Sequence, residues 1–198
     1  MISRITAVTV AMLIAAGCSG ERIVNTNEPP VQTPTATPAP PPSPPANNAH
    51  LVNAFDYVAQ VDGQTGYYFT TPSGKWRCAI IARVKAGCQS ASSWRAGLGI
   101  TGAPPTVPNA AGQATKPNAI VLNWQGDAQF AALDKPEFWL DPGPAKVVAF
   151  NRILEVGGFR CNVQEAGVSC ASDLTKNGFT FSADRYAPKY TDVPPNAP

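Results

Sequence analysis

The sequence predicts an all-β protein, built as a small antiparallel β-sandwich or a partly open barrel. Short runs alternate between apolar and polar residues, and turns containing Gly, Pro or Asn separate them. Every aromatic residue lies at or after Phe55, so the core belongs to one domain, residues 50–198. The four cysteines of that region are spaced for two hairpin disulfides.

The chain begins with a short basic segment and an apolar run that ends in a cysteine. Arg4 precedes residues 5–16, which are uncharged and mostly apolar, and Cys18 follows shortly after. The run is too short to span a bilayer and resembles a bacterial lipoprotein signal, although Ala15 replaces the usual Leu, Val or Ile. We expect residues 1–17 to be removed and Cys18 to be acylated, which would anchor the chain to the outer face of the cell membrane. An ordinary secretory signal and an uncleaved segment are the alternatives.

Proline dominates the next segment, residues 18–49. More than half of residues 29–45 are proline, so this stretch cannot bury apolar surface and should extend as polyproline II over roughly 50 Å. The alternation of threonine and proline resembles O-mannosylated bacterial stalks. The candidate glycosylation sites are Thr33, Thr35 and Thr37. An unmodified spacer is the alternative.

The strands of the domain are predicted from alternation and from the turns between them. The runs that share these features are residues 67–71, 75–82, 120–124, 128–133, 147–150, 153–156 and 179–182. Thr71-Pro72-Ser73-Gly74 fits a type I turn, so the first two runs should form a hairpin. Gln125-Gly126-Asp127 joins a second hairpin, and Asn177-Gly178 favours a third before the last run.

Two stretches depart from this pattern. Four apolar residues at helical spacing predict one short N-terminal helix: Leu51, Ala54, Phe55 and Val58. Residues 89–116 are poor in large apolar side chains and rich in Gly, Pro and Ala, so we expect a long excursion over the surface. Trp94 is the side chain in it that could hold this excursion to the domain.

An even number of cysteines in an exported chain predicts disulfides. Cys78 and Cys88 lie ten residues apart, and Cys161 and Cys170 lie nine apart. Zinc ligands usually lie roughly two to four residues apart, and the only histidine is His50 at the domain edge. We therefore expect two disulfides and no metal site. Closing loops of this length contributes roughly 2.5–3 kcal/mol each.

The two cysteine pairs belong to similar modules, residues 76–90 and 159–172. Each has an aromatic residue, an arginine and a cysteine, then an Ala-Gly turn and a second cysteine. Duplication and a shared solution to the same hairpin explain this equally well. Each cysteine should pair within its own module. A register with Val163 opposite Val168 also places Cys161 opposite Cys170, whereas a bulge at Gly167 would shift it by one residue.

The same residues carry a resemblance to a protein family. The motifs are Thr71-Pro72-Ser73-Gly74 before Cys78, Gly158-Phe159-Arg160-Cys161, Gly167-Val168-Ser169-Cys170 and Asn177-Gly178-Phe179. Over residues 67–190 the chain resembles a group of small secreted and lipidated actinobacterial proteins, chiefly mycobacterial, with no assigned activity. The resemblance implies an envelope location and two hairpin disulfides. Related chains often carry another cysteine where this chain has Gln129-Phe130-Ala131-Ala132.

The sequence contains no recognisable catalytic, cofactor-binding or phosphate-binding motif. A net charge of +2 gives no basis for nucleic-acid binding. A serine triad needs a base, and His50 is the only imidazole. Ser73-Gly74-Lys75 fits a turn better than a Ser-Lys catalytic pair. A glycosidase would draw its two carboxylates from Asp127, Asp134, Glu137, Asp141, Glu155 and Asp173, which no motif distinguishes.

Aromatic residues are the remaining functional signal. Trp94 and Trp139 are candidate contact residues, and alternation requires Tyr67 and Tyr68 to point to opposite faces. The alternative is that such residues only cap the open ends of the sandwich. We expect a non-enzymatic binding module that contacts cell-wall glycan, lipid or an envelope protein. A purely structural envelope protein and a hydrolase with an unrecognised carboxylate site are the alternatives.

Overall fold

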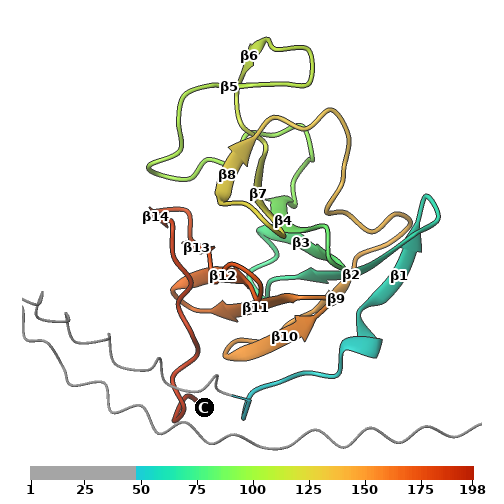
Figure 1. The fold of residues 1–198 in the computed structure, drawn as a ribbon, viewed down its shortest axis with the longest axis vertical. Helices are drawn as coiled ribbons and strands as arrows, with labels where there is room; N and C mark the ends of the chain where they lie inside the picture. Colours follow the sequence, from blue (N-terminus) through green and yellow to red (C-terminus); the bar gives the residue numbers. More distant parts are fainter. Residues whose placement is uncertain (1–47) are drawn as a thin grey trace, which may run out of the picture. The chain divides into compact units, whose positions relative to one another are not determined.

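Two stacked β-sheets make up residues 48–198, the part of the chain that this computed structural model describes (Figure 1). The predicted all-β architecture with antiparallel sheets is confirmed, and the sheets form a sandwich rather than a closed barrel. The expected signal peptide (residues 1–17) and most of the linker lie outside the described residues. So do Cys18, Thr33, Thr35 and Thr37. Within residues 48–198, no helix is long and apolar enough to cross a membrane.

The larger sheet has the strand order β1-β2-β3-β4-β7-β8, and β9 pairs in parallel with β2. Its strands are β1 (Val58–Val61), β2 (Gln64–Thr70), β3 (Trp76–Ile81), β4 (Lys85–Ser90), β7 (Ala119–Asn123), β8 (Ala128–Ala131) and β9 (Lys146–Val147). Apart from β2 and β9, neighbouring strands run antiparallel.

The second sheet is a five-stranded antiparallel meander in sequence order. Its strands are β10 (Arg152–Val156), β11 (Phe159–Gln164), β12 (Gly167–Ser172), β13 (Gly178–Phe181) and β14 (Tyr186–Ala187). A separate two-stranded ribbon, β5 (Val107–Pro108) with β6 (Ala114–Thr115), projects at the top of Figure 1.

The predicted hairpins are present. In the β2–β3 turn the Gly74 N–H donates to the Thr71 carbonyl over 2.9 Å, and Gly74 has a φ of 66°, which glycine adopts without strain. The β12–β13 turn differs from the sequence expectation. Gly178 already pairs with Ala171 inside the ladder, so Asn177-Gly178 follows a longer loop in which Lys176 has a φ of 62°.

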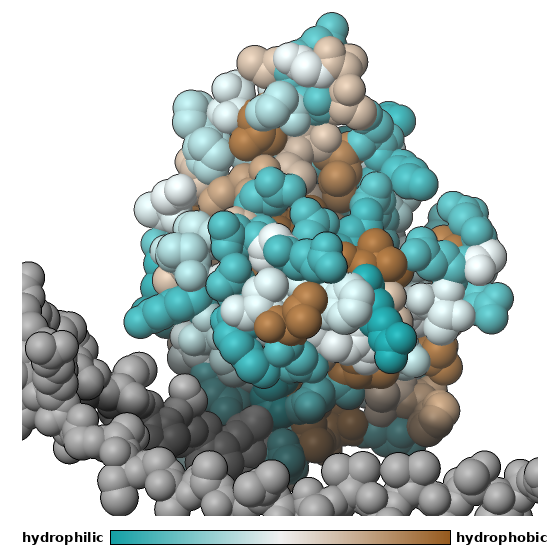
Figure 2. Space-filling view, in the orientation of Figure 1, coloured by the Kyte–Doolittle hydropathy of each residue, from teal (hydrophilic) through white to brown (hydrophobic). Residues whose placement is uncertain are grey.

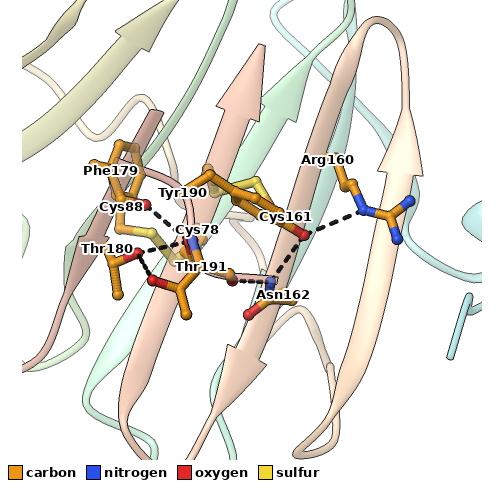
Figure 3. Close-up of a disulfide and its surroundings, with 11 residues drawn as sticks. Cys78, Cys88, Arg160, Cys161, Asn162, Phe179, Thr180, Tyr190 and Thr191 are labelled. Atoms are coloured by element: carbon orange, nitrogen blue, oxygen red, sulfur yellow. Dashed lines mark hydrogen bonds between the residues drawn. A yellow bond between two sulfur atoms is a disulfide. The ribbon is translucent and has the colours of Figure 1, made fainter. Parts of the chain in front are cut away.

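Side chains from the facing sides of both sheets form one core. Cys78 lies opposite Cys88 and Cys161 opposite Cys170, and each pair is a disulfide buried in that core (Figure 3). The predicted pairing and register are therefore confirmed. No bulge shifts the second hairpin, because Gly167 lies opposite Gln164.

The predicted N-terminal helix is wrong. The only helical segment of residues 48–198 is a single 3₁₀ turn, η1 (Ala54–Asp56), which buries none of its residues. The backbone before it is extended beside β10, where the Val52 N–H donates to the Ile153 carbonyl over 2.8 Å. Phe55 is therefore 84% exposed. Apolar residues gather at the lower right of Figure 2, over η1 and β1.

The long excursion is held to the domain by other residues than Trp94. Leu98 and Ile100 are buried against the core, and the Thr101 N–H donates to the Ala183 carbonyl over 2.9 Å. Trp94 is only partly buried. Two isolated apolar residues among Gly, Pro and Ala produce no periodic signal, which is why this contact could not be read from the sequence.

Segments without regular structure cover the outer faces of the two sheets. Residues 132–145 cross the outer face of the larger sheet, where Phe138 packs with Tyr68, Ala79 and Ile81. Residues 188–193 cross the outer face of the second sheet, where Tyr190 and Thr191 hydrogen-bond to its polar side chains (Figure 3).

Candidate ligand-binding groove

A groove of about 380 Å³ lies on the outer face of the larger sheet. It is bordered by the β1–β2 turn and by residues 132–145, which pass each other at the right of Figure 1. Its apolar lining includes Tyr68, Ile81 and Trp139. Its polar lining comprises Asp62, Gln64, Lys85, Lys135, Glu137 and Asp141. Another hollow, of about 410 Å³, lies elsewhere, and Lys75 is the one charged residue in its lining.

Strand alternation places Tyr68 at the groove. Tyr67 packs partly against the sandwich core, and Tyr68 points to the opposite face, as the alternation predicted. Residues 132–145 cover that face, so Tyr68 is only 3% exposed. Its side chain also lines the groove. Burial, and secondarily the charge of Asp62, raises the pKa of Tyr68, so the hydroxyl remains a donor at neutral pH.

Trp139 owes its position to the residue before it. Phe138 is buried against Gly87, whose missing side chain makes room for the ring: a Cβ there would lie 2.4 Å from the Phe138 Cζ. The Phe138 N–H donates to the Oε1 of the fully buried Gln89 over 3.1 Å. These two contacts fix the backbone at Phe138. Trp139, the next residue, then stands at the wall of the groove.

Arg77 from β3 lies over one face of the indole. Its guanidinium carbon lies 4.0 Å from the centre of the Trp139 ring. Arg77 lines a neighbouring hollow of about 280 Å³ and not the groove, whereas Trp139 lines both. Trp139 therefore borders both hollows, as Asp141 does, and one face of its indole is stacked on Arg77. The Trp139 Nε1 atom is buried and has no hydrogen-bond partner among the described residues.

Charges of both signs surround the groove. Lys85 Nζ forms an ion pair with Glu137 Oε2, and both side chains are largely buried. Lys135, Asp62 and Asp141 are exposed at the rim. Three carboxylates therefore face two lysines. Within residues 48–198, no group of three His, Cys, Asp or Glu residues is placed to hold a metal ion.

The residues singled out in the sequence have different positions. Trp139 lines the groove, whereas Trp94 lies outside it, with the Arg95 guanidinium 4.6 Å from its ring centre. The four cysteines of the domain are in the core and have a structural role. His50, at the start of the expected domain, has a buried ring, and neither ring nitrogen has a hydrogen-bond partner among the described residues.

Sequence reasoning missed most of the groove. Asp62, Lys85 and Lys135 come from three separate segments, and nothing in the sequence links them. The one usable signal was the run Glu137-Phe138-Trp139, in which a charged residue and two aromatics are adjacent.

Comparison of the chain with protein-family models, with curated proteins and with solved structures finds no match.

Proposed function

We propose that this protein is an exported binding module, anchored to the outer face of the cell membrane by a lipid on Cys18. Residues 18–49 act as a spacer, and the groove beside Trp139 contacts a component of the cell envelope. The observation that carries this proposal is the Trp139 indole, which is held against Arg77 at the wall of a groove with charges of both signs. Pockets with an aromatic wall and a few convergent polar groups are typical of ligand sites.

Several contacts favour binding over turnover. Glu137 is neutralised by Lys85, so its charge serves a structural ion pair. The hydroxyl of Ser73 lies 3.0 Å from that of Thr71 inside the β2–β3 turn. His50, the only histidine, makes no hydrogen bond to a hydroxyl of residues 48–198. A serine nucleophile would need such a bond to a base. The proposal includes no cofactor, no metal and no nucleic-acid partner.

A hydrolase is the second candidate. Two of the carboxylates weighed from the sequence, Glu137 and Asp141, line the same groove. A glycosidase needs two carboxyl groups facing one cleft. No specific observation favours a purely structural envelope protein. Such a role does not need a groove with a held aromatic wall.

Photo-cross-linking on intact cells tests the binding role. Lys135, which is exposed at the groove rim, is replaced by a photoreactive amino acid in the full-length chain. We expect a cross-linked product that Trp139→Ala weakens at least tenfold. Trp94→Ala is the matched control, because it removes a second arginine-stacked indole outside the groove. Equal capture by the wild type and by Trp139→Ala would show that the groove is not the contact site.

A second experiment separates binding from turnover. The captured component is isolated and incubated with wild-type protein and with Glu137→Gln and Asp141→Asn. We expect it to remain intact in all three mixtures by mass spectrometry. A product that forms with the wild type and is lost with either variant would identify a hydrolase and overturn the proposal.

A further inference from the structure

We propose that the groove binds a neutral sugar ring of a glycan, stacked on the face of the Trp139 indole that Arg77 leaves uncovered. This assignment rests on the binding role proposed above and names the chemical class of the ligand. It follows from three properties of the groove: the geometry of its aromatic wall, the signs of its charges and its size.

The aromatic wall suits the apolar face of a sugar. A sugar ring presents C–H groups on one face and hydroxyl groups around its rim, so it needs a flat, electron-rich surface with polar groups at the edges. Trp139 supplies that surface, and Arg77 at 4.0 Å fixes the plane of the ring from behind. Because the indole is already held, little side-chain freedom remains to be lost on binding.

The polar lining suits hydroxyl groups better than other ligand groups. Carboxylates only accept hydrogen bonds and lysines only donate them, whereas a hydroxyl does both. Asp62 and Asp141 at the rim can accept from a sugar hydroxyl, and Lys135 can donate to another. Tyr68, which also lines the groove, adds a hydroxyl that can do either. A lipid tail would bury these charges without partners, at a large cost in free energy.

The balance of charge favours a neutral ligand. Asp62, Glu137 and Asp141 carry three negative charges, and Lys85 and Lys135 carry two positive ones. The Lys85 ammonium is already committed to Glu137, which leaves Lys135 against two carboxylates. Arg77 behind the indole brings the charges to balance, so a phosphate, sulfate or uronic acid would meet no excess of positive charge.

The size of the groove suits a small ligand and not a protein surface. A volume of about 380 Å³ falls in the usual range of small-molecule sites. A standard protein–protein contact would instead cover about 800 Å² on each partner, over a flatter surface. A protein partner is thus an alternative outcome of the test.

A glycan array decides the ligand class. The detergent-solubilised full-length protein is applied to an array that carries neutral, sulfated and uronic-acid-containing oligosaccharides at equal density. We expect binding to neutral glycans at least tenfold stronger than to the charged ones. Trp139→Ala should abolish it, and Trp139→Phe, which keeps an aromatic face, should retain part of it. Trp94→Ala should bind like the wild type. Near-UV circular dichroism checks that each variant is folded.

The following outcomes would contradict one or both proposals. Binding confined to charged glycans, or neutral binding that Trp139→Ala leaves intact, would overturn the sugar assignment. If no glycan binds but cross-linking from position 135 still captures a protein in a Trp139-dependent way, the sugar assignment fails and the binding role stands. If neither glycan binding nor Trp139-dependent capture is seen, both proposals fail.

Discussion

The guanidinium carbon of Arg77 lies 4.0 Å from the centre of the Trp139 indole, and this contact links the larger sheet to the segment that covers it. Arg160 occupies the corresponding place in the second cysteine module. Its Nε donates to the Tyr190 hydroxyl over 3.2 Å and so links the second sheet to the C-terminal segment (Figure 3). In each module the cysteine points into the core, and the preceding arginine holds the covering segment on the outer face.

Arg77→Ala should loosen the Trp139 indole. A cation stacked on an indole contributes about 0.5–1 kcal/mol at a partly exposed site, and Arg77 is partly buried. We expect weaker cross-linking from position 135 and a changed near-UV circular dichroism spectrum. Arg95→Ala, which uncovers Trp94 in the same way, is the control and should leave capture unchanged. Unchanged capture by Arg77→Ala would mean that Trp139 is held without it.

Gly87→Ala should displace the groove wall through the fold. The added Cβ would lie 2.4 Å from Phe138 and 2.5 Å from the Ile120 carbonyl oxygen, so the Phe138 ring must move. We expect the free energy of unfolding to fall by about 1–3 kcal/mol, as for other overpacked sites, measured by urea denaturation. At Gly126 the nearest atom to an added Cβ is 3.5 Å away, and Gly126→Ala should have little effect. Similar stabilities for the two variants would contradict this packing.

Removing one disulfide should destabilise the sandwich without changing its topology. In the double variant Cys161→Ala, Cys170→Ala the loss of chain restriction lowers the free energy of unfolding by roughly 2.5–3 kcal/mol. This loss of stability is followed as a lower melting temperature of the double variant.

Non-reducing peptide mapping of the wild type should give one peptide that joins Cys78 to Cys88 and another that joins Cys161 to Cys170. A peptide that joins the two modules would disagree with the structure.

Stability should fall at alkaline pH because of Tyr190. Burial raises the pKa of Tyr190 to about 12 from 10.0, against the opposing effect of the hydrogen bond from Asn162. The pKa of Tyr190 is higher in the folded protein than in the unfolded chain. The contribution of this residue to stability is therefore fully present below pH 10. This contribution is lost as the pH rises towards 12, by at most about 3 kcal/mol.

The matched variant for this prediction is Tyr190→Phe. At pH 7 it loses the hydrogen bonds to Arg160, Asn162 and Asp192, and its free energy of unfolding should fall by about 1–3 kcal/mol. Between pH 10 and 12 its stability should change less than that of the wild type. A residual fall is expected from Tyr57, Tyr68 and Tyr186, whose pKa values are also raised by burial. Parallel pH profiles for the two proteins would exclude Tyr190 as the cause.

Membrane attachment should depend on Cys18. Cys18→Ala removes the thiol that the proposed signal would present for acylation, so processing and membrane association should both be lost. Metabolic labelling with a fatty-acid analogue, followed by cell fractionation, measures these effects. A wild-type protein that takes up no label would rule out the lipid anchor.

Most of the strands, the hairpins and the disulfide pairing followed from local rules, although β1 was not expected and the run at 147–150 is a strand only at 147. Alternation places Cys161 and Val163 on one face of β11, and the short Ala-Gly turn then sets Cys170 opposite Cys161. Such features depend on neighbours within about a dozen residues, so the sequence could show them. The helix expected at residues 51–58 failed because pairing with β10, about a hundred residues away, imposed an extended backbone.

The sequence by itself determined the β-sandwich class, the hairpin disulfides and two candidate tryptophans. Only the tertiary structure decided that Trp139 borders a groove and that Trp94 does not. It also decided that Asp62, Lys85 and Lys135 surround that groove, and that Leu98 and Ile100 hold the long excursion. The physical reason is that covering segments take their positions from single long-range contacts, such as Phe138 on Gly87 and Trp139 on Arg77. Such contacts leave no periodic pattern in the chain.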